Sequence, residues 1–182
     1  MSNSKSFLRK EILTNLTRLS SPLRKNQTLK LVNRFLNLKC VSQSNSIGIT
    51  ISKFPELDTH LLIQRLWNLH KRIYCPLILP MHKMDFIEIN EKTNFIKNKI
   101  GIYEPVYQKT LVDNMPEIMV VPGLGYSLVT NQRIGFGGGY YDRFLQNYHG
   151  KKIALALPSQ IIKNNSWEIE KTDIYLDKII TL

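Results

Sequence analysis

The densest glycine cluster of the chain lies between an apolar run and a segment with helical periodicity. The run 118–121 predicts a buried strand, which Pro122 and Gly123 end. The cluster 135–139 leads into residues 140–148, where aromatic and aliphatic side chains recur at helical spacing. A strand, a glycine-rich loop and a helix in this order predict an anion site. The reason is that the first amides of a helix lack partners and its dipole favours negative charge.

Arg133 precedes the glycines and Asp142 follows them. An arginine and a carboxylate around such a loop are typical of a phosphate site that also holds a cation. Two known phosphate motifs are excluded. The lysine-bearing phosphate loop requires a lysine after its last glycine, and the dinucleotide fingerprint requires a further glycine there. This chain has Tyr140 at that position. A plain tight turn is the alternative, but the convergence of arginine, glycines, tyrosines and aspartate favours a ligand site.

Apolar runs and amphipathic segments alternate along the 182 residues. Helices are expected over residues 4–20, 21–38, 57–72 and 140–148. Strands are expected over residues 47–51, 73–79, 84–89, 118–121, 153–157 and near the C-terminus. Pro76 predicts that its strand is short or near a sheet edge, and residues 91–99 are expected to form a polar connection. We therefore expect an α/β fold: a single three-layer Rossmann-like domain over residues 1–182, with a largely parallel or mixed sheet and N-terminal helices.

Composition excludes several classes of protein. Hydrophobic residues make up 43% and charged residues 21% of the chain, as in ordinary globular domains. No apolar run is long enough to span a bilayer, and the first ten residues are polar and basic. Cys40 and Cys75 belong to no metal or redox pattern. We therefore expect a cytoplasmic protein without a membrane partner.

The formal net charge of +11 has two interpretations, an anionic partner or a compositional bias toward Lys, Asn and Ile. The bias is favoured for the charge as a whole. The basic residues are scattered and no nucleic-acid motif is present, so a basic nucleic-acid-binding module is the weaker alternative. The four histidines show no metal-ligand spacing. Trp67 is expected in the core, and Trp167 is expected in a polar turn without an assigned role.

The stretch VVPGLGYSLVTNQRIGFGGGYYDRFL, residues 120–145, resembles the signature of the 5-formyltetrahydrofolate cyclo-ligase family, also called methenyltetrahydrofolate synthetases. The family pattern runs V-P-G-L-A-F-D, a short spacer and R-L-G-Y-G-G-G-Y-Y-D-R. This chain departs from it at Gly125, where the family often has Ala, and at Ser127, where it usually has Asp. If that Asp supports the loop, the rigidity of the loop differs in this chain.

Four shorter segments also resemble the family. Residues 5–9 match its K-x-x-L-R, residues 56–59 resemble E-V-D-T, and residues 101–105 resemble G-[IL]-x-E-P. Residues 173–180 resemble its terminal strand, with an aspartate at the place of Asp177. The resemblance spans nearly the whole chain, but only residues 133–142 form a highly specific block.

The resemblance implies a role for each group of residues. Arg133 is the expected catalytic residue, and Asp142 and Asp177 are the expected ligands of Mg²⁺. The expected ATP contacts are Lys5, Ser6, Phe7, Leu8, Arg9, Arg133, Ile134, Gly135, Phe136, Gly137, Gly138, Gly139, Tyr140 and Tyr141. The expected folate contacts are Ile51, Glu56, Phe136, Gly137, Gly138, Gly139 and Tyr140. Without the resemblance, Lys5 and Arg9 are typical of a solvated helix face, and Glu56 of a first-turn acid near a helix dipole.

The implied reaction is the ATP- and Mg²⁺-dependent closure of 5-formyltetrahydrofolate to 5,10-methenyltetrahydrofolate, with release of ADP and phosphate. Phosphorylation turns the formyl oxygen into a leaving group, and N10 of the folate then closes the ring. This chemistry needs no covalent nucleophile, and no Ser/His/Asp or Cys/His set is recognisable. The expected partners are reduced folate and ATP, without nucleic acid, and a monomer is expected. A non-catalytic nucleotide- or folate-binding relative is the alternative, against which the intact Lys5, Arg133 and Asp142 argue.

Overall fold

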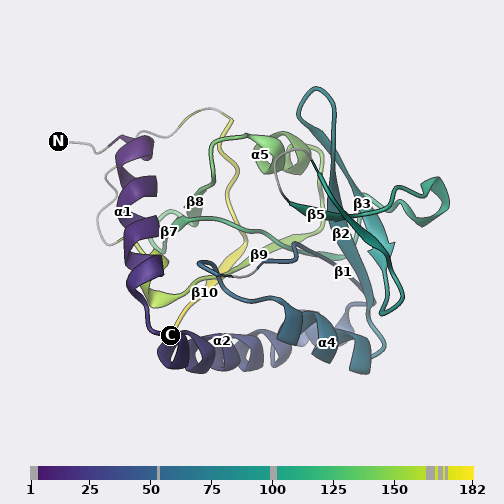
Figure 1. Ribbon diagram of the computed structural model, residues 1–182, viewed down its shortest axis with the longest axis horizontal. Coiled ribbons are helices and arrows are strands. Elements are labelled where there is room, and N and C mark those ends of the chain that lie inside the picture. Colours follow the sequence, from purple (N-terminus) through teal and green to yellow (C-terminus); the bar gives the residue numbers. More distant parts are fainter. Residues whose placement is uncertain (1–3, 53, 99–101, 163–166, 168–169, 171) are drawn as a thin grey trace.

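The computed structural model describes residues 4–52, 54–98, 102–162, 167, 170 and 172–182. A six-stranded sheet forms its centre, with helices packed against it (Figure 1). In sheet order the strands are β10 (Lys178–Ile180), β9 (Lys151–Leu155), β6 (Ile118–Val120), β1 (Ser46–Ile49), β2 (Arg72–Leu79) and β3 (Lys83–Ile89). Neighbouring strands are parallel except for the antiparallel hairpin of β2 and β3. The expected α/β fold with a largely parallel or mixed sheet and N-terminal helices is confirmed.

Helices from the N-terminal part of the chain pack together with one face of this sheet. They are α1 (Lys5–Arg18), α2 (Ser21–Leu36), the short α3 (Lys39–Gln43) and α4 (His60–Asn68). An aliphatic or aromatic stripe on each longer helix enters the core, as shown by the fully buried Leu16, Phe35 and Leu66. Ser4 caps α1, because its Oγ accepts a bond from the backbone N–H of Phe7 (3.3 Å).

A second core cluster lies on the opposite face, together with α5 (Tyr140–Leu145). Successive residues of one strand belong to different clusters. Ile118 and Met119 of β6 do so, and so do Ile153 and Ala154 of β9. Side chains alternate across a strand, so a strand that is covered on both faces has a continuous apolar sequence. This explains why residues 118–121 are apolar throughout.

The order of the strands reverses at β1. The chain leaves β1 through α4 to form β2 on one side, and later places β6 on the other side of β1. The carboxyl ends of β1 and β6 therefore flank a switch point. In open α/β sheets, ligands bind in the crevice at such a point.

Two small hairpins complete the described fold. β4 (Phe95–Lys97) pairs with β5 (Tyr103–Pro105), and β7 (Gly125–Ser127) pairs with β8 (Gln132–Ile134). Two 3₁₀ turns, η1 (Lys109–Leu111) and η2 (Pro158–Gln160), follow β5 and β9. The expectation that residues 91–99 only connect other elements is wrong, because they contain β4. Glu104 fixes this hairpin to the main sheet, since its Oε1 accepts a bond from the N–H of Ile78 (2.8 Å).

Strand β2 has eight residues and agrees closely with the expected range 73–79. Its pairing with β1 extends only to Tyr74, so Pro76 lies beyond that ladder, where a missing N–H breaks no bond to β1. The prediction of a position near the edge is correct, because only β3 lies outside β2.

Helix α4 is shorter than the expected 57–72. Thr59 Oγ1 accepts a bond from Ser52 N (2.9 Å) and donates to Thr50 O (2.8 Å), which keeps the preceding residues out of the helix. At the other end, His70 has a positive φ of 56°, and a left-handed residue ends a helix.

Helix α5 ends at Leu145 and not at Tyr148. Tyr148 is buried in the second core cluster, and its hydroxyl donates to Pro116 O (2.6 Å). Trp167, which was expected in a polar turn without a role, is 7% exposed and belongs to the first core cluster. The described helices include none with both the length and the apolar character that a membrane span needs.

Candidate active site

A pocket opens at the carboxyl ends of β1 and β6, where the strand order reverses. Its empty volume is about 390 Å³, including the space at its mouth. Thr50 and Ser52 line it after β1, and residues 121–123 line it after β6. Gln160 holds this second wall, because its Nε2 donates to Gly123 O (2.8 Å) while its Oε1 accepts from Leu157 N (2.9 Å).

Glu56 is the one carboxylate among the residues that line this pocket. In the part of the chain that the structure describes, its side chain has no hydrogen-bond or ion-pair partner. Burial raises the pKa of Glu56 to about 7. This carboxyl is therefore available to a ligand that carries N–H donors. Ile51, the other residue expected to meet only the folate, packs against the first core cluster and does not line the pocket.

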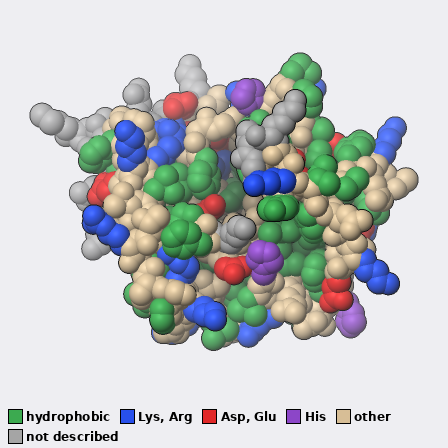
Figure 2. Space-filling view, viewed as in Figure 1, with side chains coloured by type: hydrophobic (Ala, Val, Ile, Leu, Met, Phe, Trp, Pro, Cys, Tyr) green, Lys and Arg blue, Asp and Glu red, His purple; other side chains and the backbone are tan. Residues whose placement is uncertain are grey.

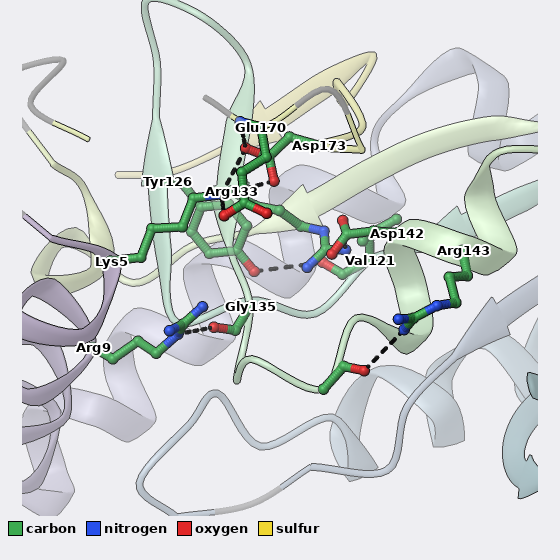
Figure 3. Close-up of polar contacts among 11 residues, drawn as sticks. Lys5, Arg9, Val121, Tyr126, Arg133, Gly135, Asp142, Arg143, Glu170 and Asp173 are labelled. Carbon is green, nitrogen blue, oxygen red and sulfur yellow. Dashed lines mark hydrogen bonds and ion pairs between the residues drawn. The ribbon is translucent and has the colours of Figure 1, made fainter. Parts of the chain in front are cut away.

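The loop 135–139 needs glycine at two positions. Gly137 has a φ of 101° and Gly139 a φ of 67°, which side-chain-bearing residues rarely adopt. Two arginines hold the loop (Figure 3): Arg9 Nε donates to Gly135 O (2.8 Å), and Arg143 Nη1 donates to Gly138 O (3.2 Å). Residues 136–138 remain exposed. A ligand can therefore approach the backbone of the loop closely.

Arg133 and Asp142, which flank the glycines in sequence, form an ion pair in space. Arg133 Nη2 lies 2.7 Å from Asp142 Oδ1, and the two side chains are 4% and 27% exposed. The guanidinium also lies over the ring of Tyr141, 5.7 Å from its centroid. Arg133 Nε has no partner among the described residues. The buried guanidinium of Arg133 is stabilised by the negative charge of Asp142. The other carboxylate oxygen of Asp142, Oδ2, makes no bond within the described structure.

Helix α1 brings Lys5 and Arg9 to different partners (Figure 3). Arg9 reaches the glycine loop, whereas Lys5 Nζ lies 2.9 Å from Glu170 Oε1 and 2.8 Å from Asp173 Oδ2. Burial lowers the pKa of Lys5, but its hydrogen bonds to these carboxylates and their charges outweigh burial and raise the pKa. The other expected ATP contacts on α1 differ in exposure: Ser6 and Phe7 are exposed, and Leu8 is buried in the core.

The two expected metal ligands do not come together. Asp142 lies beside Tyr141, whose hydroxyl is 2.5 Å from Thr50 Oγ1 at the carboxyl end of β1. Asp177 immediately precedes β10, and its Oδ2 accepts a bond from Lys152 N (2.6 Å) near the start of β9. Because β10, β9, β6 and β1 are parallel, Asp177 lies at the opposite, amino-terminal edge of the sheet.

Asp142 offers a carboxylate oxygen to a cation beside the glycine loop. Mg²⁺ is satisfied by one or two carboxylates, phosphate oxygens and water. Among the described residues, no three or more His, Cys, Asp or Glu side chains form a group that could hold a metal. The residues present fit a Mg²⁺ that arrives with phosphates and gains Asp142 as a protein ligand.

Sequence reasoning missed three residues near the site: Thr50, Glu170 and Asp173. Lys5 and Arg9 are one helical turn apart, so the carboxylates on Lys5 lie close to the loop that Arg9 holds. The sequence has three acidic residues from position 170 to position 177. The resemblance to the family's terminal strand indicated only Asp177 as a site residue. No local spacing indicates which of them faces α1.

Comparisons with known proteins show the family to which the chain is related. A family model described as the 5-formyltetrahydrofolate cyclo-ligase family matches residues 1–182. A 5-formyltetrahydrofolate cyclo-ligase of Haemophilus influenzae is 34% identical over 149 residues, which cover 76% of this chain and 79% of that protein. The cyclo-ligase of Escherichia coli K12 is 28% identical over 157 residues, which cover 81% of this chain and 84% of that protein.

Solved structures support the same relationship. A 5,10-methenyltetrahydrofolate synthetase of Aquifex aeolicus is similar with a TM-score of 0.80 and 25% identity, covering 97% of this chain and 89% of that chain. A 5,10-methenyltetrahydrofolate synthetase of Mycoplasma pneumoniae shares the fold, with a TM-score of 0.73, 22% identity and 97% coverage of both chains. This chain therefore belongs to the 5-formyltetrahydrofolate cyclo-ligase family.

Proposed function

We propose that this chain is an ATP- and Mg²⁺-dependent 5-formyltetrahydrofolate cyclo-ligase that forms 5,10-methenyltetrahydrofolate, ADP and phosphate. One observation carries the proposal: a pocket with a single unpartnered carboxyl adjoins a glycine loop flanked by Arg133 and Asp142. The carboxyl of Glu56 suits a heterocycle that presents N–H donors, and the loop suits a polyphosphate. Membership of the family supports this assignment of the two substrates.

The folate is proposed to place its pterin ring in the pocket. Glu56 would accept hydrogen bonds from N–H groups of the ring, which favours the ionised carboxylate and draws its raised pKa back down. Phe136 is 58% exposed and Tyr140 is half-buried, so both aromatic rings of the loop can contact a ring that leaves the pocket mouth.

The triphosphate of ATP is proposed to lie along the glycine loop. A helix end supplies about half a positive charge, and α5 has only six residues, so backbone amides cannot neutralise several negative charges. Arg133 and Arg9 supply the cations that already contact or flank the loop. Mg²⁺ on Asp142 would neutralise further charge on the phosphates. Lys5 could reach the same phosphates only by giving up its bonds to Glu170 and Asp173.

The chemistry then depends on holding the two substrates together. The formyl oxygen attacks the γ-phosphorus of ATP, and ADP leaves. N10 attacks the activated carbon, the former formyl oxygen departs within phosphate, and the proton of N10 passes to solvent. Arg133 would stabilise the charge that develops on the transferring phosphoryl oxygens, and the loop would fix the distance to the folate.

The proposed partners are small molecules, and we propose a monomeric, cytoplasmic enzyme. Cys40 and Cys75 are both free, which suits a reducing compartment. Lys and Arg side chains are spread over the face shown in Figure 2 and form no continuous stripe on it. That face therefore lacks the charge pattern typical of nucleic-acid-binding proteins.

The direct test is incubation of the purified protein with 5-formyltetrahydrofolate and Mg-ATP. A near-ultraviolet absorption band of the methenyl bridge should grow, and ADP should form in equal amount. Reactions without ATP serve as the control. A folate that stays unchanged with ATP present would show that the proposed activity is wrong.

A further inference from the structure

One contact of Thr50 links the pocket to helix α5, which directly follows the glycine loop. Thr50 is the first residue after β1 and lines the pocket, and its Oγ1 lies 2.5 Å from the hydroxyl of Tyr141. Tyr141 is the second residue of α5, directly before Asp142. The bonded residues are 91 positions apart in sequence, so this contact depends on the tertiary fold.

Both ends of the contact are held by further bonds. Thr50 O accepts from Thr59 Oγ1 (2.8 Å), which also binds Ser52 N (2.9 Å) in the segment that leads to Glu56. On the other side, the guanidinium of Arg133 lies over the ring of Tyr141 and forms an ion pair with Asp142. Bonds and ring contacts therefore run from the segment before Glu56 through Thr50 and Tyr141 to the Arg133–Asp142 pair.

The length and environment of the contact make it a restraint. An O···O distance of 2.5 Å is at the short end of the range for hydroxyl hydrogen bonds. No other hydrogen-bond partner of the Tyr141 hydroxyl occurs among the described residues. Loss of Thr50 Oγ1 would leave that hydroxyl without a partner among the described residues.

We propose that Thr50 is a positioning residue that sets the distance between the folate pocket and the nucleotide loop, acting through Tyr141. The proposal rests on the proposed function, because two substrates must meet across this contact. Phosphoryl transfer depends steeply on the separation of the reacting atoms, so displacement of the loop lowers turnover more than it lowers the binding of either substrate.

Steady-state kinetics of four variants test the proposal. Thr50→Val removes the hydroxyl at nearly constant volume and should lower kcat about tenfold, with both KM values within about threefold of wild type. Tyr141→Phe should lower kcat similarly, and the double variant should be no worse than either single one. Thr50→Ser restores the hydroxyl and should bring kcat within about threefold of wild type. Unchanged kcat in Thr50→Val, or multiplying losses in the double variant, would overturn the proposal.

Thr28→Val is the matched control. Thr28 is buried and lies on α2, and its Oγ1 has no partner within the described structure. Its replacement therefore removes a hydroxyl without breaking a bond. This variant should keep the wild-type kcat. An equal loss of kcat in Thr28→Val and Thr50→Val would mean that the effect is general, and the proposal fails.

Amide hydrogen exchange separates failure of this proposal from failure of the proposed function. Peptides that cover residues 133–145 should exchange faster in Thr50→Val and Tyr141→Phe than in wild type or Thr28→Val, with or without substrates. If wild type shows no cyclo-ligase turnover, the proposed function fails, and exchange still reports on the contact. If turnover is present but both exchange and kcat are unchanged in Thr50→Val, only the positioning role fails.

Discussion

The pocket and the glycine loop are neighbours, but they are held in different ways. Short-range hydrogen bonds fix one pocket wall, as between Thr59 and Ser52, and between Ser52 Oγ and Leu57 O (2.8 Å). The loop is held by charged side chains, including Arg9, which lies 126 positions away in sequence. The pocket contains one carboxyl, whereas three arginines and Asp142 contact or flank the loop.

Because the two regions are held differently, variants in the pocket and variants in the loop should change different kinetic parameters. The pocket takes its shape from strand ends, so changes there should act on folate binding and on the ionisation of Glu56. The loop takes its shape from ion pairs and arginine–carbonyl bonds, so changes there should act on ATP and on turnover. Variants on the two sides should therefore have distinct kinetic signatures.

The largest effect is expected at Arg133. Arg133→Gln removes the buried cation beside the loop and should lower kcat about 100-fold or more, as loss of a charge-stabilising donor does. Steady-state rates at saturating Mg-ATP measure this. Arg72→Gln is the control, because Arg72 forms an exposed pair with Glu88, and such pairs contribute about 1 kcal/mol or less. If Arg133→Gln retains most of the turnover, the loop takes no part in the reaction.

Asp142→Asn should act on the metal. Turnover should fall at least about tenfold, and the Mg²⁺ concentration for half-maximal rate should rise, because a charged ligand is lost. Tm should also drop, since the buried Arg133 loses its anionic partner. Asp177→Asn, at the other edge of the sheet, should leave the Mg²⁺ dependence unchanged. If instead only Asp177→Asn shifts the Mg²⁺ titration, the metal assignment to Asp142 is wrong.

On α1, Arg9 and Lys5 should behave differently. Arg9→Ala should raise KM for ATP about tenfold, equivalent to about 1.4 kcal/mol, because Arg9 lies on the loop. Lys5→Ala should raise it only about threefold and lower Tm, because Glu170 and Asp173 lose their cation. Lys10→Ala, on the exposed side of the same helix, is the control. Equal KM values in all three variants would mean that α1 makes no phosphate contact.

The smallest effect concerns Glu56. Glu56→Gln should raise KM for the folate several-fold and leave KM for ATP unchanged, which would separate the pocket from the loop. Glu91→Gln, an exposed carboxylate after β3, is the matched control. A change in KM for ATP of the same size would contradict the separation of the two regions.

The same variant should change how stability depends on pH. In the folded protein, burial raises the pKa of Glu56 from an ordinary value of 4.5 to about 7. The folded state therefore binds more protons than the unfolded state between these values, and Glu56 lowers stability as pH rises from about 4.5 to 7. Gln cannot ionise, so Tm of Glu56→Gln minus Tm of wild type should increase by a few degrees from pH 5 to pH 8. A constant difference would show that Glu56 ionises normally.

Local pattern in the sequence was enough for several elements. The apolar stripes predicted α1 and α2 nearly to their ends, and the apolar run before Pro122 predicted β6. The passage from glycines into a helix at Tyr140 was also correct. These features follow from periodicity, proline and glycine, which act over a few residues. Helix ends were less certain because side-chain bonds, such as those of Thr59, stop helices for reasons that periodicity does not contain.

Only the tertiary structure decided which distant residues meet. Asp173 and Asp177 are four positions apart, yet one pairs with Lys5 near the glycine loop and the other lies at the amino ends of the strands. Trp167 stands in a polar stretch of sequence but is buried in the core. The Thr50–Tyr141 contact has no local signal at all. Such contacts depend on the order of strands in the sheet and on which face each segment covers, and these are properties of the packed chain and not of local spacing.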